Sequence, residues 1–159
     1  MEHLKALKAT LAAGITAVSA FLGWKGIMAL AWIIVMALDY LSGSAAAMKA
    51  GQWSSADARQ GLWHKCGMIL VVLVSGITDG VMAVLLGNIP AMGIEWPGAL
   101  LPLVLAWYIL TELGSILENA VKLGAAVPQW LVKFLKQSLS AVDNAGEITD
   151  ENDSKGEEK

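Results

Sequence analysis

Two aspartates, each inside a segment otherwise apolar enough to cross a bilayer, constrain this sequence more than any other feature. Asp39 and Asp79 are joined by a polar, Ser-rich stretch that ends at Lys65. An ionisable side chain in hydrocarbon costs about 2.5–3.5 kcal/mol on insertion scales, so each aspartate needs a compensating environment. The two segments are therefore predicted to face each other or to face water.

Composition indicates a membrane protein followed by a short polar segment. Hydrophobic residues make up 56% of the 159-residue chain and charged residues only 16%, against about 25% in an average soluble domain. Residues 143–159 carry a net charge of −5 against −3 for the whole chain, so the remainder carries +2. We predict a membrane-embedded domain over residues 1–140 and a disordered acidic tail over residues 141–159.

Apolar runs predict an all-α integral membrane protein with three to four transmembrane helices. Helices are expected at about 26–48, 66–89 and 98–123, each long enough to cross about 30 Å of hydrocarbon. A preceding helix, at about 4–24, has a shorter uncharged part, so it either spans with a tilt or lies in the interface. We favour the span, with the break between the first two helices at Lys25.

A last helix, at about 128–140, is predicted to lie in the membrane interface. Trp130 and Phe134 fall on one of its faces, whereas Lys133 and Lys136 fall on the other. This combination of an apolar face with a basic one is typical of helices at the bilayer surface.

The distribution of basic residues predicts the orientation. Lysines and one arginine occupy the 49–65 connection and the segment after the last span, whereas the 88–97 turn has neither. The positive-inside rule places the basic segments in the cytoplasm. We therefore expect a multi-pass membrane protein with its C-terminus in the cytoplasm.

Small residues mark positions where helices are able to approach closely. Gly43 and Ala47 follow Asp39 at successive intervals of four, which places all three on one helix face. Gly76 and Gly80 form a GxxxG pair in the next span. We predict helix packing at these four small residues, although GxxxG pairs are frequent in apolar helices.

The polar residues of the 98–123 span gather within about one third of its circumference. They are Thr111, Glu112, Ser115, Glu118, Asn119 and Lys122. With Asp39 and Asp79 they form the candidate pore-lining or assembly face. In the alternative interpretation, these acids are protonated, or paired with each other or with Lys122, in a structural core. A proton relay would use similar groups.

Other chemistries find little support in the sequence. The single cysteine, Cys66, excludes an internal disulfide framework and a Cys-based zinc site. No Walker loop, GxSxG or HExxH motif is present, and no basic patch suggests nucleic-acid binding. His64 beside Cys66 is interpreted as the end of a polar loop and not as a metal site. We expect no enzymatic activity, metal or cofactor.

Two motifs carry a family resemblance from about residue 32 to residue 135. The first comprises Asp39, Gly43, Ala46, Ala47, Ser54, Ser55, Gly61, Lys65 and Asp79. The second comprises Glu112, Leu113, Gly114, Ser115, Ile116, Leu117, Glu118 and Asn119, followed by Gly124 and Pro128. Together they resemble a family of bacteriophage holins that includes the clostridial toxin-secretion holin-like proteins.

The resemblance implies a small protein of the host bacterium's cytoplasmic membrane that oligomerises late in phage infection and opens lesions for host lysis. An endolysin, or in some members a toxin, then crosses the membrane without needing direct contact with the holin. The resemblance also makes Ser54, Ser55, Gly61 and Lys65 a cytoplasmic loop motif, and it implies neither catalysis nor a cofactor. The acidic tail and His64, which stands where a second basic residue often precedes Lys65, depart from the family pattern. A small ion channel, a proton-coupled transporter and an antiholin are the alternatives.

Overall fold

The computed structural model describes residues 2–89 and 96–147, and this part of the chain is all-α without strands, as predicted. The four helices are α1 (Glu2–Lys49), α2 (Ser55–Gly87), α3 (Leu100–Lys122) and α4 (Gln129–Gly146). Three segments of this part are long and apolar enough to cross a membrane: Gly23–Lys49, Ser55–Gly87 and Leu100–Lys122. These segments confirm the three spans expected between residues 26 and 123.

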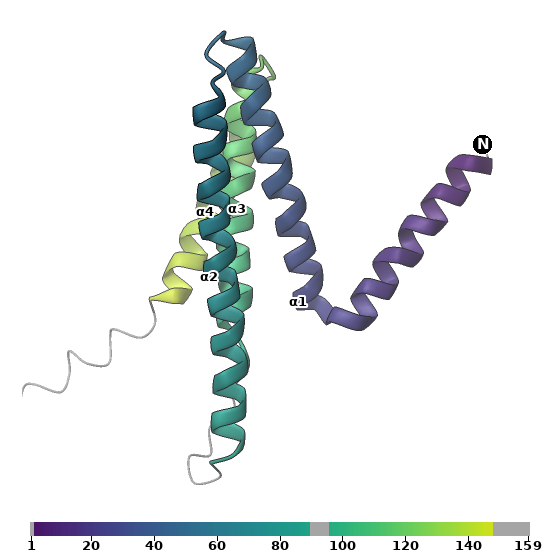
Figure 1. The fold of residues 1–159 in the computed structure, drawn as a ribbon, viewed down its shortest axis with the longest axis vertical. Helices are drawn as coiled ribbons and strands as arrows, with labels where there is room; N and C mark the ends of the chain where they lie inside the picture. Colours follow the sequence, from purple (N-terminus) through teal and green to yellow (C-terminus); the bar gives the residue numbers. More distant parts are fainter. Residues whose placement is uncertain (1, 90–95, 148–159) are drawn as a thin grey trace, which may run out of the picture.

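Helix α1 bends sharply at Gly23, two residues before the predicted break. Gly23 has a φ of 63° and a ψ of −170°, a conformation that glycine reaches without the steric cost of a side chain. The part of α1 that precedes Gly23 leads away from the other helices (Figure 1). Whether this first segment spans the membrane or lies in its interface stays a prediction.

Helix α2 begins eleven residues earlier than predicted, so the expected 49–65 loop is wrong over most of its length. Ser54 caps the helix, because its hydroxyl oxygen accepts hydrogen bonds from the backbone N–H groups of Ala56 (3.1 Å) and Asp57 (3.3 Å). Asp57 also places a negative charge at the positive end of the helix dipole. The polar residues of this stretch therefore lie mostly in the capped first turns of α2.

Helix α4 continues to Gly146, so the prediction that its helix ends near residue 140 is wrong. The half-buried Leu139 and Val142 continue the face that packs on α3. In addition, Trp107 Nε1 of α3 donates a 2.7 Å hydrogen bond to Asp143 Oδ1. The rest of the predicted disordered tail, residues 148–159, lies outside the described residues.

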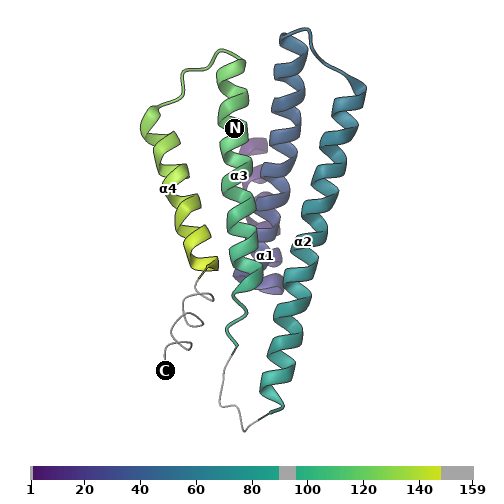
Figure 2. The same cartoon turned by 90° about the vertical axis from the view of Figure 1, so that its left-hand side faces the viewer.

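Helix α3 is the central element of the bundle. It packs against α1, α2 and α4, whereas α1 and α2 touch each other over only a short stretch. Figure 2 shows α3 between α4 and the other two helices. The apolar core is small: Trp32, Met68 and Leu105 contribute one buried side chain from each of α1, α2 and α3. Trp32 also stacks on Tyr108, with ring centroids 6.1 Å apart.

The core-facing positions recur mostly at intervals of seven, the spacing by which helices pack along a common seam. They include Trp32, Asp39 and Ala46 in α1, Lys65, Met68, Ser75 and Asp79 in α2, and Leu105, Glu112 and Asn119 in α3. Along this seam, the middle positions are apolar and most positions on either side of them are polar. The seam therefore brings charged side chains from different helices together on either side of the small core.

Candidate functional site

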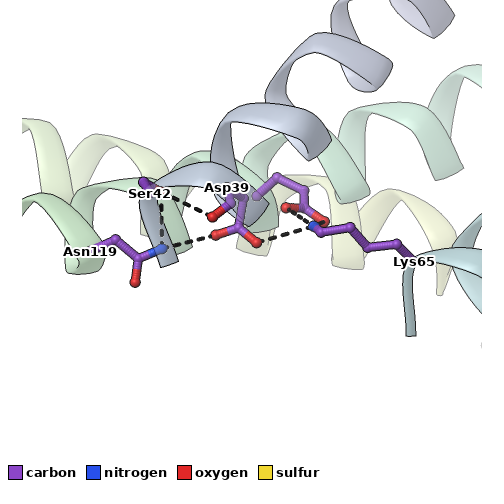
Figure 3. Close-up of polar contacts among 5 residues, drawn as sticks. Asp39, Ser42, Lys65 and Asn119 are labelled. Carbon is purple, nitrogen blue, oxygen red and sulfur yellow. Dashed lines mark hydrogen bonds and ion pairs between the residues drawn. The ribbon is translucent and has the colours of Figure 1, made fainter. Parts of the chain in front are cut away.

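Three charged side chains from three helices meet at one end of the core. The Nζ atom of Lys65 in α2 lies 3.0 Å from Asp39 Oδ2 in α1 and 2.8 and 2.7 Å from the two carboxylate oxygens of Glu112 in α3. Figure 3 shows the ammonium group directed at Asp39. We call these residues the charged triad. Because each member comes from a different helix, the charged triad ties α1, α2 and α3 together.

The charged triad is withdrawn from solvent. The side chains of Lys65, Asp39 and Glu112 are 11%, 20% and 5% exposed. Burying such charges carries a desolvation cost of several kcal/mol per ion, which is offset only when the geometry and the additional hydrogen bonds are good. Here the ammonium group donates to three carboxylate oxygens, and two carboxylates share one cation.

An amide extends this network toward the α1–α2 connection. Asn119 Nδ2 donates to Asp39 Oδ1 (3.2 Å) and to Ser42 Oγ (3.1 Å), and the Ser42 hydroxyl donates to the backbone oxygen of Asp39 (3.0 Å). A Cβ atom at Gly43 would lie 3.4 Å from Asn119 Nδ2. The absence of a side chain at Gly43 therefore lets α3 bring its amide against α1.

Asp79 occupies a different place from Asp39. Its Oδ1 accepts hydrogen bonds from Trp96 Nε1 (3.0 Å) and the Leu100 N–H (3.2 Å), and its Oδ2 accepts from the Leu101 N–H (2.9 Å). The N-cap residue of α3, Ala99, provides no side-chain acceptor. Asp79 therefore caps α3 from the neighbouring helix and compensates the positive end of its dipole.

The two aspartates consequently do not face each other. Lys65, the partner of Asp39, and Asp79 lie fourteen residues apart on α2, which is about 21 Å along a helix axis. Next to Asp79, Lys25 Nζ donates to the backbone oxygen of Gly98 at 2.8 Å. Each buried aspartate thus has its own set of donors, at opposite ends of the apolar core.

A polar cleft opens beyond the charged triad, between α1, the first turns of α2 and the last turns of α3. Its volume is about 380 Å³. Lys65 and Asn119 line its buried end, and the small residues Gly43, Ala47 and Gly61 help to leave it unfilled. We call this space the end cleft. Of the predicted loop motif, Ser54, Gly61 and Lys65 line the end cleft, whereas Ser55 is an exposed residue of α2.

The predicted polar stripe of α3 divides between two environments. Glu112 and Asn119 are buried against α1 and α2, while Ser115, Glu118 and Lys122 line the end cleft. Thr111 donates to the backbone oxygen of Trp107 at 2.9 Å. The interpretation that paired the acids with Lys122 named the wrong lysine, because Lys65 is the cation that Asp39 and Glu112 share. A pore-lining role for the stripe stays a prediction.

The two glycines of the predicted GxxxG pair lie in different environments. A Cβ atom at Gly76 would lie 3.7 Å from the Leu101 side chain, so Gly76 lies against α3. A Cβ atom at Gly80 would have no neighbour within 4 Å among the described residues. Of this pair, Gly76 is therefore the glycine that packs against another described helix.

Sequence reasoning missed the inward direction of Lys65, which it assigned to a loop. The signal was present in the spacing, since Lys65, Met68, Val72, Ser75 and Asp79 alternate at intervals of three and four. An extended helix starting at the Ser54 cap places all five on one face. Lys25 and Trp96 were also missed as members of the group around Asp79, and no motif distinguishes them.

Comparison with known proteins identifies a family for this chain. The model of the bacteriophage holin family matches residues 16–140. An uncharacterized protein of Clostridium perfringens (strain 13 / Type A) is 33% identical over 116 residues, which cover 73% of this chain and 75% of that protein. An uncharacterized protein of Halalkalibacterium halodurans is 31% identical over 108 residues, covering 68% and 72%.

A third relative, an uncharacterized 14.9 kDa protein in the nagH 3′ region of Clostridium perfringens, is 34% identical over 105 residues, covering 66% of this chain and 71% of that protein. No solved structure matches the chain. The family model covers more than half of the sequence and includes both spans that carry the charged triad's acids. The protein, a multi-pass protein of the cytoplasmic membrane, belongs to the bacteriophage holin family.

Proposed function

We propose that this protein is a lysis-timing holin, which oligomerises in the host membrane and opens lesions through which an endolysin, or in some systems a toxin, crosses. The charged triad is the observation that carries this proposal. It places three ionisable groups between three membrane-length helices that share only a small apolar core. The packed arrangement of these three helices is stable while the three charges are paired, and it is lost when the charges are separated.

The charged triad links helix separation to hydration. If α1, α2 and α3 separated in lipid, Lys65, Asp39 and Glu112 would enter hydrocarbon unpaired, at a cost of about 2.5–3.5 kcal/mol each. If they separated around water, the same groups would be hydrated. Oligomers that enclose water therefore favour the separated state, and their number grows with protein concentration by mass action. In this mechanism, the acids of the charged triad are paired with Lys65 inside each copy before the helices separate.

The charge distribution supports a cytoplasmic location for the end cleft and the C-terminus. Lys49, Arg59 and Lys122 lie toward the end that holds the cleft, and the lysines of α4 follow shortly after. Lys25 is a basic residue at the opposite end of the bundle, where its ammonium group donates a hydrogen bond to the Gly98 carbonyl. Most basic side chains of the bundle therefore mark one end as cytoplasmic under the positive-inside rule.

An induced-lysis assay tests the proposal. The protein is expressed in a bacterium with a cytoplasmic muralytic enzyme that lacks a signal sequence, while turbidity and membrane potential are recorded together. We expect abrupt lysis that coincides with loss of the potential and requires both proteins. Loss of the potential without enzyme release would instead indicate a small channel or transporter. Delay of a co-expressed holin, without lysis by the protein itself, would indicate an antiholin.

A further inference from the structure

Helix α4 lies beside a membrane span and not beyond its end. The chain turns back between α3 and α4, where Gly124 has a φ of 95° and Pro128 precedes the first turn of α4. Figure 2 shows α4 returning alongside α3 over much of the length of that span. Asp143 Oδ1 accepts a 2.7 Å hydrogen bond from Trp107 Nε1, and Trp107 lies fifteen residues, about 22 Å of helix, from Lys122. The C-terminal half of α4 therefore lies at the depth of the hydrocarbon that α3 crosses.

The face of α4 that packs on α3 is apolar. Its half-buried residues, which recur at intervals of three and four, include Leu131, Leu135, Leu139 and Val142. Across from them, Gly114 and Val121 of α3 line an apolar cavity of about 130 Å³ between the two helices. These residues follow Glu112 and Asn119 by two positions, which is about 200° around a helix. Helix α4 thus packs on the side of α3 that faces away from the charged triad, and its position does not depend on whether the triad is paired.

The face of α4 turned away from α3 is polar along its length. Its exposed residues at intervals of three and four, which we call the α4 stripe, are Lys133, Gln137, Ser140 and Asn144. Lys136 and Asp143 flank the stripe on one side, and Trp130 and Phe134 flank it on the other. Neither Lys133 nor Lys136 forms an ion pair with a described acid.

Lipid is an unsuitable surrounding for the α4 stripe. Among the described helices, α4 packs on α3 alone, so no other helix covers its polar face. Polar and ionisable side chains at membrane depth are costly unless they face a bundle interior or water. The packing of apolar side chains on α3 compensates little, because lipid tails are as apolar as leucine. The position of α4 therefore requires water beside it at the depth of the bilayer.

We propose that α4, in this docked position, lines the water-filled lesion with its stripe. This role for α4 rests on the proposed function, and it assigns the lumen to α4 and not to the polar residues of α3, of which Glu112 and Asn119 are buried. While a copy is surrounded by lipid, α4 leaves α3 and lies at the cytoplasmic membrane surface. There Trp130 and Phe134 enter the interface and the lysines stay hydrated. Docking of α4 accompanies oligomerisation.

The full-length protein in lipid vesicles tests the proposal, with Cys66→Ser as the background for single cysteines that carry a bimane fluorophore. The vesicles hold a small dye and a labelled dextran, whose release reports lesions independently of α4. Bimane on Asp143→Cys reports docking, because the indole of Trp107 quenches it on contact, and Trp107→Phe is the matched control. Bimane on Ser140→Cys reports water through quenching by iodide, and Leu139→Cys, which faces α3, is its control.

We expect both signals to rise with release as the protein-to-lipid ratio increases. The quenching that depends on Trp107 should rise roughly tenfold, as a docked state of about 10% or less becomes the major one. Iodide quenching at Ser140→Cys that stays at the level of Leu139→Cys during release would overturn the proposal. Equal intensities with Trp107 and with Trp107→Phe during release would place α4 at the membrane surface and would also overturn it. Release of the dye without the dextran, with both signals present, would contradict the proposed function and leave α4 as the lining of a narrower pore.

A variant without labels provides a second test. Gln137→Leu combined with Ser140→Leu makes the middle of the α4 stripe apolar, so docked α4 no longer prefers water to lipid. We expect delayed lysis in the induced-lysis assay. Ala141→Leu is the control, because it adds apolar bulk on the flank that carries Phe134 and should leave the timing unchanged. Unchanged timing in the double variant, or an equal delay in the control, would overturn the proposal.

Discussion

Replacement of Lys65 by methionine is the sharpest test of the charged triad. Methionine retains an unbranched side chain of similar length but removes the cation, so Asp39 and Glu112 are left without the group that now contacts them at 3.0, 2.8 and 2.7 Å. Removal of one partner from a buried ion pair typically costs about 3–5 kcal/mol. The three side chains are at most 20% exposed, so solvent screening reduces this only modestly.

A loss of this size changes the equilibrium between packed and separated helices roughly a hundredfold or more, at about 1.4 kcal/mol per factor of ten. The free energy of unfolding is measured in mixed micelles by titration with a denaturing detergent, with tryptophan fluorescence as the signal. In cells, the same variant should trigger lysis earlier, since the closed state is weakened. Lys122→Met is the control, because it removes an exposed lysine of α3 that forms no ion pair with a described residue.

A combined variant separates stranded charge from lost packing. Lys65→Met with Asp39→Asn and Glu112→Gln removes all three charges while retaining similar shapes, so much of the lost stability should return. The reasoning is refuted if Lys65→Met unfolds like Lys122→Met. It is equally refuted if the combined variant is no more stable than Lys65→Met, because the loss would then come from packing alone.

Two further predictions concern the opposite end of the core. Asp79→Asn removes the charge that caps α3 and should cost about 0.5–2 kcal/mol, seen as faster amide hydrogen exchange in the first turn of α3, while exchange around Trp32 is unchanged. Gly98→Ala should cost about 1–3 kcal/mol in unfolding free energy, because Gly98 has a φ of 66°, which residues with a side chain rarely adopt, and the added methyl group would displace Lys25 Nζ from the Gly98 carbonyl. Gly80→Ala, whose methyl group meets no described residue within 4 Å, should instead be neutral or stabilise α2 by up to about 1 kcal/mol. Equal losses in the two glycine variants would contradict this account.

The spans and their approximate ends could be predicted because they depend on local composition. A run of apolar residues as long as the bilayer is thick is nearly sufficient to define a membrane helix. The α3 helix, Leu100–Lys122, lies within two residues of the range predicted for it. The start of α2 could not be found in this way, since its first turns are polar and resemble a loop in composition. Only the Ser54 cap and the spacing of Lys65 indicate helix there.

The partners of the charged side chains were harder to predict than their positions. Asp39 and Asp79 attract attention in the sequence because both interrupt apolar runs, yet their donors lie far away in the chain. Lys65 pairs with Glu112, which lies 47 positions later in the sequence. Because the sequence predicts a helix that begins only at residue 66, Lys65 falls in a loop and this contact is not expected. Pairing depends on the rotation and vertical shift of each helix, which local patterns determine only after the helix ends are known.

The balance between the small core and the polar contacts suits the change of state that the proposed function requires. In a bilayer, apolar side chains gain little by leaving lipid for one another, so polar contacts and close packing determine how helices associate. Here the buried hydrophobic side chains of the described chain are few: Trp32, Ala46, Met68 and Leu105.

Even within this core, the indole N–H of Trp32 is buried with no acceptor among the described residues, which costs about 1–3 kcal/mol in the closed state. The polar contacts that hold the bundle differ from apolar packing in one respect: water can replace them. A bundle stabilised mainly by its charged triad and by the Asp79 cap therefore resists separation in lipid and tolerates it around water. We expect this difference in environment, more than any change in sequence-specific packing, to set the point at which accumulated holin opens the membrane.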